Sequence, residues 1–164
     1  MRMHFLLLVT FVLTTTVFFG QQTFKRNDIY FEFLGNGILA SINYERQLTS
    51  KPGLGLRAGL GYYSGDDKFR VTIPLGVNYL LMLTKNKSFL EAGIGGTWSG
   101  AAGLKDDTPT GERDYSERIW SLVPSFGYRG ITNSTFMWRA SYTPIINKYK
   151  VLWQWFGISI GKRF

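Results

Sequence analysis

The stretch that decides the fold is Phe156-Gly157-Ile158-Ser159-Ile160-Gly161-Lys162-Arg163-Phe164. Its residues alternate between two faces, with large side chains on one side and mostly small ones on the other. This alternation is the pattern of a β-strand, whose successive side chains point in opposite directions. The termini of soluble domains usually fray. A strand that continues to an aromatic last residue is therefore expected to pair with another strand.

The same ending resembles the C-terminal assembly signal of bacterial outer-membrane β-barrels, in which a final Phe shares a face with residues two, four and six positions earlier. Ile160 and Ile158 fit this pattern, and Lys162 departs from it. The resemblance implies that the barrel assembly machinery and periplasmic chaperones act on the chain during biogenesis. The residues that would form the signal are Phe156, Ile158, Ile160 and Phe164.

The first 20 residues have the pattern of an export signal. Arg2 precedes an apolar run from residue 5 to 19, and Gly20 is a small residue suited to cleavage. The run is interrupted by threonines and is shorter than the about 20 apolar residues of a membrane-spanning helix. We therefore predict a signal peptide over residues 1–20 that is cleaved near Gly20, and a short N-terminal segment over 21–26.

The composition predicts an all-β protein of one domain. Aromatic residues make up 16% of the chain, which also holds 19 glycines, and no long segment has a helical period. The formal net charge is +8, but the basic residues are scattered, so nothing predicts nucleic acid as a partner. The chain has no Cys, which excludes disulfides.

The remaining chain contains eight runs near the length of a tilted membrane-spanning strand, which is about 9 to 11 residues. In the clearest run Leu54, Leu56 and Leu60 share one face, and Gly55 and Arg57 lie on the other. One connection, 99–116, is long, and the rest are short, as in outer-membrane barrels. The predicted strands are 27–35, 37–47, 54–63, 69–81, 88–98, 117–129, 135–145 and 152–164.

The faces of these strands indicate which side meets lipid. Placing Arg57 toward lipid near the middle of a bilayer would cost about 2 to 4 kcal/mol, so we expect the charged, glycine-rich faces to line the lumen. We expect a network of opposite charges there, formed by Glu32, Glu45, Arg57, Arg70, Glu91 and Arg139. On the aliphatic side, aromatic residues near the strand ends would form two girdles, with Tyr62, Trp98, Trp120 and Tyr142 outside and Tyr44, Tyr79 and Tyr128 on the periplasmic side.

Residues 27–164 as a whole resemble the small eight-stranded outer-membrane β-barrel family of the OmpX and OmpA transmembrane-domain type. The residues that carry the resemblance are the first two runs, Ile29-Tyr30-Phe31-Glu32-Phe33-Leu34-Gly35 and Ala40-Ser41-Ile42-Asn43-Tyr44-Glu45-Arg46. The resemblance implies an antiparallel up-and-down barrel in the cell outer membrane. It implies no specific activity.

The residue types needed for most catalysis are missing from the predicted barrel. The only His is His4, inside the predicted signal, so no Ser-His, Cys-His or ordinary zinc site is expected. We predict neither an enzyme nor a cofactor or metal site. Asp106, Gly111 and Glu117 match three positions of a Ca²⁺ loop, but its third and fifth positions are threonines. A mobile solvated loop is the simpler interpretation.

The charged lumen has two interpretations, an ion path and an internal salt-bridge network, and the narrow interior of eight strands favours the second. The leading functional hypothesis is a non-enzymatic barrel with an envelope-structural role, or a surface-interaction role through its outer loops. Two alternatives stay open: a soluble exported lipocalin-like barrel that binds a small apolar ligand, and a lipid-modifying enzyme. Outer-membrane lipids and lipopolysaccharide are the expected partners, the latter through phosphate contacts of Lys105, Arg113, Lys148 and Lys150.

Overall fold

Eight antiparallel strands close into one barrel in the structure, a computed structural model that describes residues 24–65, 68–85, 87–101, 118–132 and 135–164. Each strand pairs with the strands before and after it around the barrel, which confirms the predicted all-β architecture. The predicted signal peptide lies outside the described residues. The barrel strands are β1 (Asn27–Leu34), β2 (Ala40–Gln47), β3 (Leu54–Gly65), β4 (Lys68–Thr84), β5 (Ser88–Ala101), β6 (Ile119–Thr132), β7 (Phe136–Tyr142) and β10 (Phe156–Arg163).

Pairing between β1 and β10 closes the barrel. The register runs from Asp28 opposite Arg163 to Leu34 opposite Gly157. Beyond it, the Phe164 N–H donates to the Asn27 carbonyl at 2.8 Å. No open edge is left between the first and last barrel strands, which satisfies the backbone groups as a lipid environment requires.

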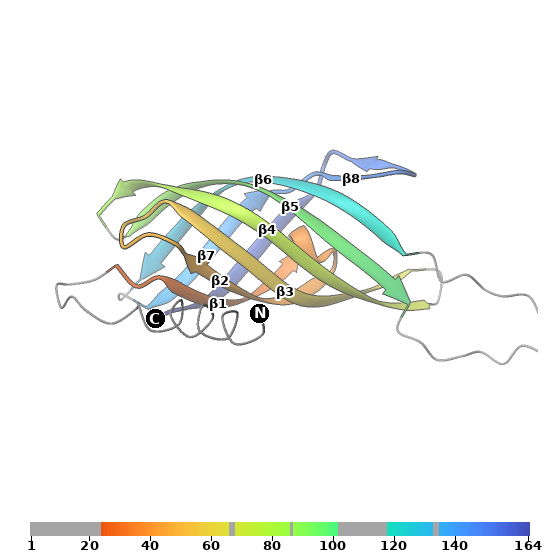
Figure 1. Cartoon of the computed structure of the whole chain (residues 1–164), viewed down its shortest axis with the longest axis horizontal. Coiled ribbons are helices and arrows are strands. Elements are labelled where there is room, and N and C mark those ends of the chain that lie inside the picture. Colours follow the sequence, from red (N-terminus) through yellow and green to blue (C-terminus); the bar gives the residue numbers. More distant parts are fainter. Residues whose placement is uncertain (1–23, 66–67, 86, 102–117, 133–134) are drawn as a thin grey trace, which may run out of the picture.

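Figure 1 shows the strands crossing the barrel obliquely, with the C terminus at one end and β8 at the other. We call the end that holds Asn27 and Phe164 the terminal end, and the opposite one the hairpin end. The connections from β2 to β3 and from β4 to β5 lie at the terminal end. Among the described residues, no helix has the length and apolarity needed to cross a membrane.

Side chains alternate between the two faces of the wall, except at the end of β4, where Leu81, Met82 and Leu83 are all exposed and the register with β5 shifts. In β6 the side chains of Trp120, Leu122 and Phe126 are exposed on the outside, and Val123 is buried inside. The outward side chains of the other strands are mostly aliphatic or aromatic, and the inward ones are polar, charged or glycine. The wall therefore has an apolar exterior and a polar interior.

The predicted strands 135–145 and 152–164 differ from the structure. β7 ends at Tyr142 and β10 begins at Phe156, with one further bond from the Thr143 N–H to the Trp155 carbonyl. Pro144 follows, and it has no N–H with which to continue the ladder. The chain between them forms a small hairpin, β8 (Ile145–Asn147) and β9 (Val151–Leu152), which extends from β6.

The connection between the predicted strands 27–35 and 37–47 also differs from a simple hairpin turn. It is a single 3₁₀ turn, η1 (Gly35–Gly37), and its three residues are buried. The backbones of Leu34 and Ile38 have positive φ angles of 58° and 75°. These conformations are strained for residues other than glycine. In Figure 1 the turn does not extend as far toward the hairpin end as β5 does.

A small apolar cluster fills the lumen toward the terminal end. Arg163 stacks its guanidinium over the rings of Phe24 and Phe89, at 4.8 and 5.3 Å. The cluster excludes water from one side of the charged residues described next. Its buried members are Tyr30, Leu80, Phe89, Ile131 and Met137, with Phe24 packed against them.

Candidate functional site: the charged lumen

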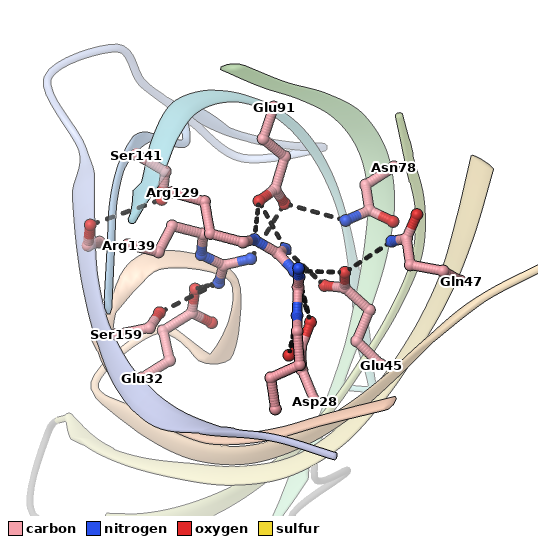
Figure 2. A network of polar contacts seen from close by, with 12 residues as sticks. Asp28, Glu32, Glu45, Gln47, Asn78, Glu91, Arg129, Arg139, Ser141 and Ser159 are labelled. Carbon is pink, nitrogen blue, oxygen red and sulfur yellow. Dashed lines mark hydrogen bonds and ion pairs between the residues drawn. The ribbon is translucent and has the colours of Figure 1, made fainter. Parts of the chain in front are cut away.

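Arg129 is the centre of a buried ion-pair cluster inside the barrel. β6 brings its side chain into the lumen, where Nη1 and Nη2 contact the two Glu45 oxygens at 2.7 and 2.8 Å. Nη1 also contacts Asp28 at 2.8 Å, and Nε and Nη2 contact Glu91 at 2.9 and 2.6 Å. Figure 2 shows the three carboxylates converging on this guanidinium from different parts of the wall. One cation therefore links strands β1, β2 and β5 to β6.

Arg139 extends the cluster along β7. Its Nη1 lies 3.1 Å from Glu91, and its Nη2 lies 2.5 Å from Glu32 and 3.1 Å from the Ser159 hydroxyl. The guanidinium also lies over the Tyr30 ring, 4.7 Å from its centroid. Glu91 is thus shared between Arg129 and Arg139, as Figure 2 shows.

Arg163 completes the cluster at the closing pair of strands. Its Nε and Nη2 bind the two Asp28 oxygens at 2.8 and 2.9 Å. Two carboxylates also accept hydrogen bonds from neutral amides: Asn78 donates to Glu91, and Gln47 donates to Glu45. We call this set the lumen cluster: Asp28, Glu32, Glu45, Glu91, Arg129, Arg139 and Arg163.

Burial explains why these charges are so completely paired. The side chains of Arg129, Glu45 and Asp28 have no exposed surface. Removing an ion from water costs several kcal/mol, which only close pairing and further hydrogen bonds offset. Bidentate hydrogen bonds between a guanidinium and a carboxylate are among the strongest hydrogen bonds in proteins. The cluster therefore fixes the relative positions of the strands that supply it.

The residues expected in a lumen network divide into three groups. Glu32, Glu45, Glu91 and Arg139 lie in the lumen cluster. Arg57 is buried in the lumen, but its Nε and Nη2 have no hydrogen-bond partner. Arg70 is half-buried near the hairpin end of β4, about 26 Å along the strand from Asn78. Arg70 is therefore too far along the strand to join the cluster.

Sequence reasoning missed three members of the lumen cluster. Asp28, Arg129 and Arg163 were not among the expected residues, although each has the parity of an inward position in its strand. Arg163 follows the outward Lys162, and Arg129 follows the outward Tyr128. Strict application of the two-residue period to the strand ends would have found them.

The turn η1 closes the lumen on the other side of the cluster. Thr72 and Thr97, on the far wall, donate their hydroxyls to the Gly37 and Asn36 carbonyls at 3.0 and 2.7 Å. Trp155 donates its indole N–H to the Gly35 carbonyl at 3.1 Å. These bonds account for the strained backbone around the turn, because they hold it across the barrel.

The lumen cluster is a paired and enclosed network of charges. The carboxylates of the lumen cluster all face guanidinium groups, and the apolar cluster and η1 lie on either side of them. Among the described residues, no group of three or more His, Cys, Asp or Glu side chains could hold a metal ion. The segment in which Asp106, Gly111 and Glu117 match positions of a Ca²⁺ loop, interpreted above as a solvated loop, lies outside the described residues.

Comparison with known proteins gives one similar structure. No protein-family model matches the chain, and no curated protein does. The crystal structure of the N-terminal β-barrel domain of Pseudomonas aeruginosa OprF matches with a TM-score of 0.60 and 12% sequence identity. The match covers 85% of this chain and 96% of that domain. The chain has the fold of an eight-stranded outer-membrane barrel.

In an outer-membrane barrel of this kind the outer wall faces hydrocarbon, and the predicted girdle residues can be placed on it. Tyr44, Tyr62, Tyr79, Trp120, Tyr128 and Tyr142 have exposed side chains, and Trp98 is half-buried next to Trp120 in the register. Tyr142 contacts Phe156 and Tyr128 contacts Trp138, with ring centroids 5.5 and 5.3 Å apart.

The residues expected to form the assembly signal share the outer face of β10. These side chains are all exposed, and so is that of Lys162 on the same face; the four residues are Phe156, Ile158, Ile160 and Phe164. A protein that recognised this pattern would meet one continuous face of the closing strand.

Proposed function

We propose that the protein is a non-enzymatic integral outer-membrane barrel, with an envelope-structural role or a surface-interaction role through the connections at its hairpin end. The terminal end would face the periplasm, because the connections from β2 to β3 and from β4 to β5 are short. The observation that carries the proposal is the division of side chains in the wall. Every acidic residue that the structure describes is buried in the lumen, and the outer face is a belt of apolar side chains.

The polar lumen argues against the two alternatives. A lipocalin-like barrel would need an apolar interior cavity. In the described residues the lumen holds the charged cluster, and the aliphatic side chains lie mainly on the outer face of the wall. A lipid-modifying enzyme would need an activated nucleophile or an acid-base pair. The buried carboxylates are already occupied by arginines, and no His or Cys lies after His4.

The β8–β9 hairpin favours lipopolysaccharide as a surface partner. Lys148 and Lys150 are exposed on it, and Tyr149 and Trp153 expose large aromatic rings beside them. Lysine binds phosphate, and aromatic rings are enriched at membrane interfaces. We propose that this hairpin contacts the phosphorylated headgroups of the outer leaflet. Lys105 and Arg113, expected to act with it, lie outside the described residues.

Biogenesis would depend on the outer face of β10. The exposed row of Phe156, Ile158, Ile160 and Phe164 supports recognition by periplasmic chaperones and by the barrel assembly machinery. Deleting Phe164 removes two backbone bonds with Asn27 and the terminal aromatic side chain. Its expected effect is slower or incomplete membrane insertion.

The location is tested by membrane fractionation combined with heat-dependent gel mobility. The protein should stay in the membrane after high salt and carbonate, and should run as two bands, folded and heat-unfolded. Release by carbonate would overturn the proposal. A replacement of residues 146–151 by a short glycine-serine turn then tests the role of the hairpin. It should leave the two bands intact and reduce binding of the purified protein to lipopolysaccharide.

A further inference from the structure

The terminal end carries a ring of basic side chains with no acidic neighbours among the described residues. Each acidic residue that the structure describes lies in the lumen cluster, so none is available to pair with this ring. The ring residues come from the segment before β1, from β2, from the connections between β2 and β3 and between β4 and β5, and from β10. They are Lys25, Arg26, Arg46, Lys51, Lys85, Lys87 and Lys162, and all are exposed or half-buried.

Arg46 differs from the rest of the ring because a groove in the outer wall begins beside it. The groove has a volume of about 700 Å³. Along one side it follows the register from Arg46 through Leu56 and Val77 to Ile94. Arg46 and Arg57 are the charged residues of the lining, and Arg57 is buried with its side chain in the lumen. The groove therefore joins a charged end at Arg46 to an otherwise mostly apolar path.

Small residues on the other side of the groove make it a depression. There the register runs from Tyr44 through Ala58 and Leu75 to Gly96 and Leu122. A Cβ on Gly96 would meet its nearest atoms at 3.8 Å, which is an ordinary contact, so no side chain is pressed against the wall there.

The dimensions of the groove fit an acyl chain. From β2 to β6 it crosses four interstrand spacings, or about 19 Å. One leaflet of the hydrocarbon core is about 15 Å thick. Because the strands tilt, a row that crosses them also rises through the membrane, so a tilted chain anchored at Arg46 would reach the middle of the bilayer within the groove.

The end of the groove at Arg46 is suited to binding a phosphodiester group. Tyr44 donates its hydroxyl to Asn27 Oδ1 at 2.8 Å, and Arg46 contacts the same oxygen through Nη1 at 3.4 Å. The guanidinium is half-buried, and its other edge can bind two phosphate oxygens. Neighbouring basic residues add attraction for a net negative headgroup.

We propose that Arg46 and the groove form a binding site for an anionic phospholipid of the periplasmic leaflet. Arg46 holds the headgroup phosphate, Tyr44 borders it, and one acyl chain lies over Ala58 and Gly96. This inference rests on the proposed membrane location and goes beyond it by naming a selective lipid.

The test is native mass spectrometry of the folded protein in detergent, titrated with phosphatidylglycerol or with phosphatidylcholine of the same acyl chains. Phosphatidylglycerol should bind more tightly. R46Q should weaken its binding about fivefold, the effect expected for one basic residue near an anionic surface. K162Q, in the same ring but on β10, should change it less than twofold. Equal weakening by both variants would mean diffuse attraction to the ring and would overturn the site.

A second pair of variants tests the groove. A58L fills it, whereas A140L adds the same side chain to an exposed alanine on β7, outside the groove. Binding should fall about twofold or more with A58L and stay unchanged with A140L, because close contact with the chain is lost only in the first. An unchanged A58L would overturn the acyl-chain position. Excess inorganic phosphate should not displace the lipid, and displacement would overturn the groove's contribution.

These outcomes are separable from the proposed function. Heat-dependent gel mobility of every variant reports whether the barrel is folded. A protein that shows the two bands but no preference for phosphatidylglycerol contradicts only the lipid site. A protein that fails to remain in membranes contradicts the proposed function.

Discussion

Along β10, Ser159 and Arg163 point into the lumen and are buried, whereas Ile158 and Ile160 are exposed on the outer wall. Neighbouring residues on one strand thus obey different rules. Inside, each charge depends on particular partners at hydrogen-bond distance, so identity and geometry both matter. Outside, a side chain needs only to be apolar, because hydrocarbon has no shape or polar group to match. Substitutions of the same type on the two faces should therefore have very different effects on the free energy of unfolding.

The largest expected effect is the loss of Arg129. R129M leaves Asp28, Glu45 and Glu91 buried without their shared cation, and breaking a buried pair in this way costs about 3 to 5 kcal/mol. Urea unfolding in detergent micelles, followed by gel mobility, measures the change. R118M, at an exposed position before β6, should stay within about 0.5 kcal/mol. Similar stability of the two variants would mean that the cluster does not hold the strands together.

Truncating the same residue type on the two faces compares them directly. Leu80 is 1% exposed in the apolar cluster, and Leu60 is 62% exposed on the outer wall. L80A should lose about 2 to 5 kcal/mol through the cavity that it creates. L60A should lose less than about 1 kcal/mol, because lipid fills the space. The same unfolding experiment in lipid vesicles measures both, and a larger loss for L60A would reverse the assignment of the faces.

A charge placed on the outer wall tests whether this wall meets hydrocarbon. I158R should destabilise the barrel in vesicles by about 2 to 4 kcal/mol if Ile158 lies near the middle of the bilayer. I29R, near the terminal end and opposite Lys162 in the register, should cost about 0 to 1 kcal/mol. Equal effects at the two depths would be inconsistent with a membrane-spanning barrel.

Adding one methyl group gives the smallest of these contrasts. A Cβ on Gly161 would collide with the Ile29 carbonyl and with Tyr30, whereas a Cβ on Gly96 has only ordinary contacts, at 3.8 Å and beyond. G161A should therefore lose about 1 to 3 kcal/mol, as overpacked variants do. G96A should be close to neutral. Thermal unfolding monitored by circular dichroism can resolve the two variants. An unchanged stability of G161A would show that the backbone shifts to accommodate the methyl group at little cost.

The two-residue period was enough to predict the barrel and most of the inward and outward faces. It worked because one face of each strand is almost purely apolar, as in Leu54, Leu56 and Leu60. Partners inside the lumen could not be predicted in this way. The period assigns Glu91 to the inside, but its contact with Arg129 depends on the register between strands and on the tilt of the wall.

The first connection escaped prediction for a similar reason. Asn36-Gly37 has the composition of a simple hairpin turn, but bonds from Thr72, Thr97 and Trp155 hold it in the lumen. Those donors are remote in sequence, so no local pattern could reveal them. By contrast, Pro144 was a visible signal that the long strand 135–145 had to end early.

The ion pair between Asp28 and Arg163 joins residues 135 positions apart. The wall cannot close until β10 is available to β1, so the cylinder forms only when nearly all of its strands are present. Such dependence on distant contacts slows folding and lengthens the time during which apolar strand faces are unprotected. We expect the rate of closure, rather than the stability of the finished cylinder, to determine how much of the newly made protein escapes aggregation.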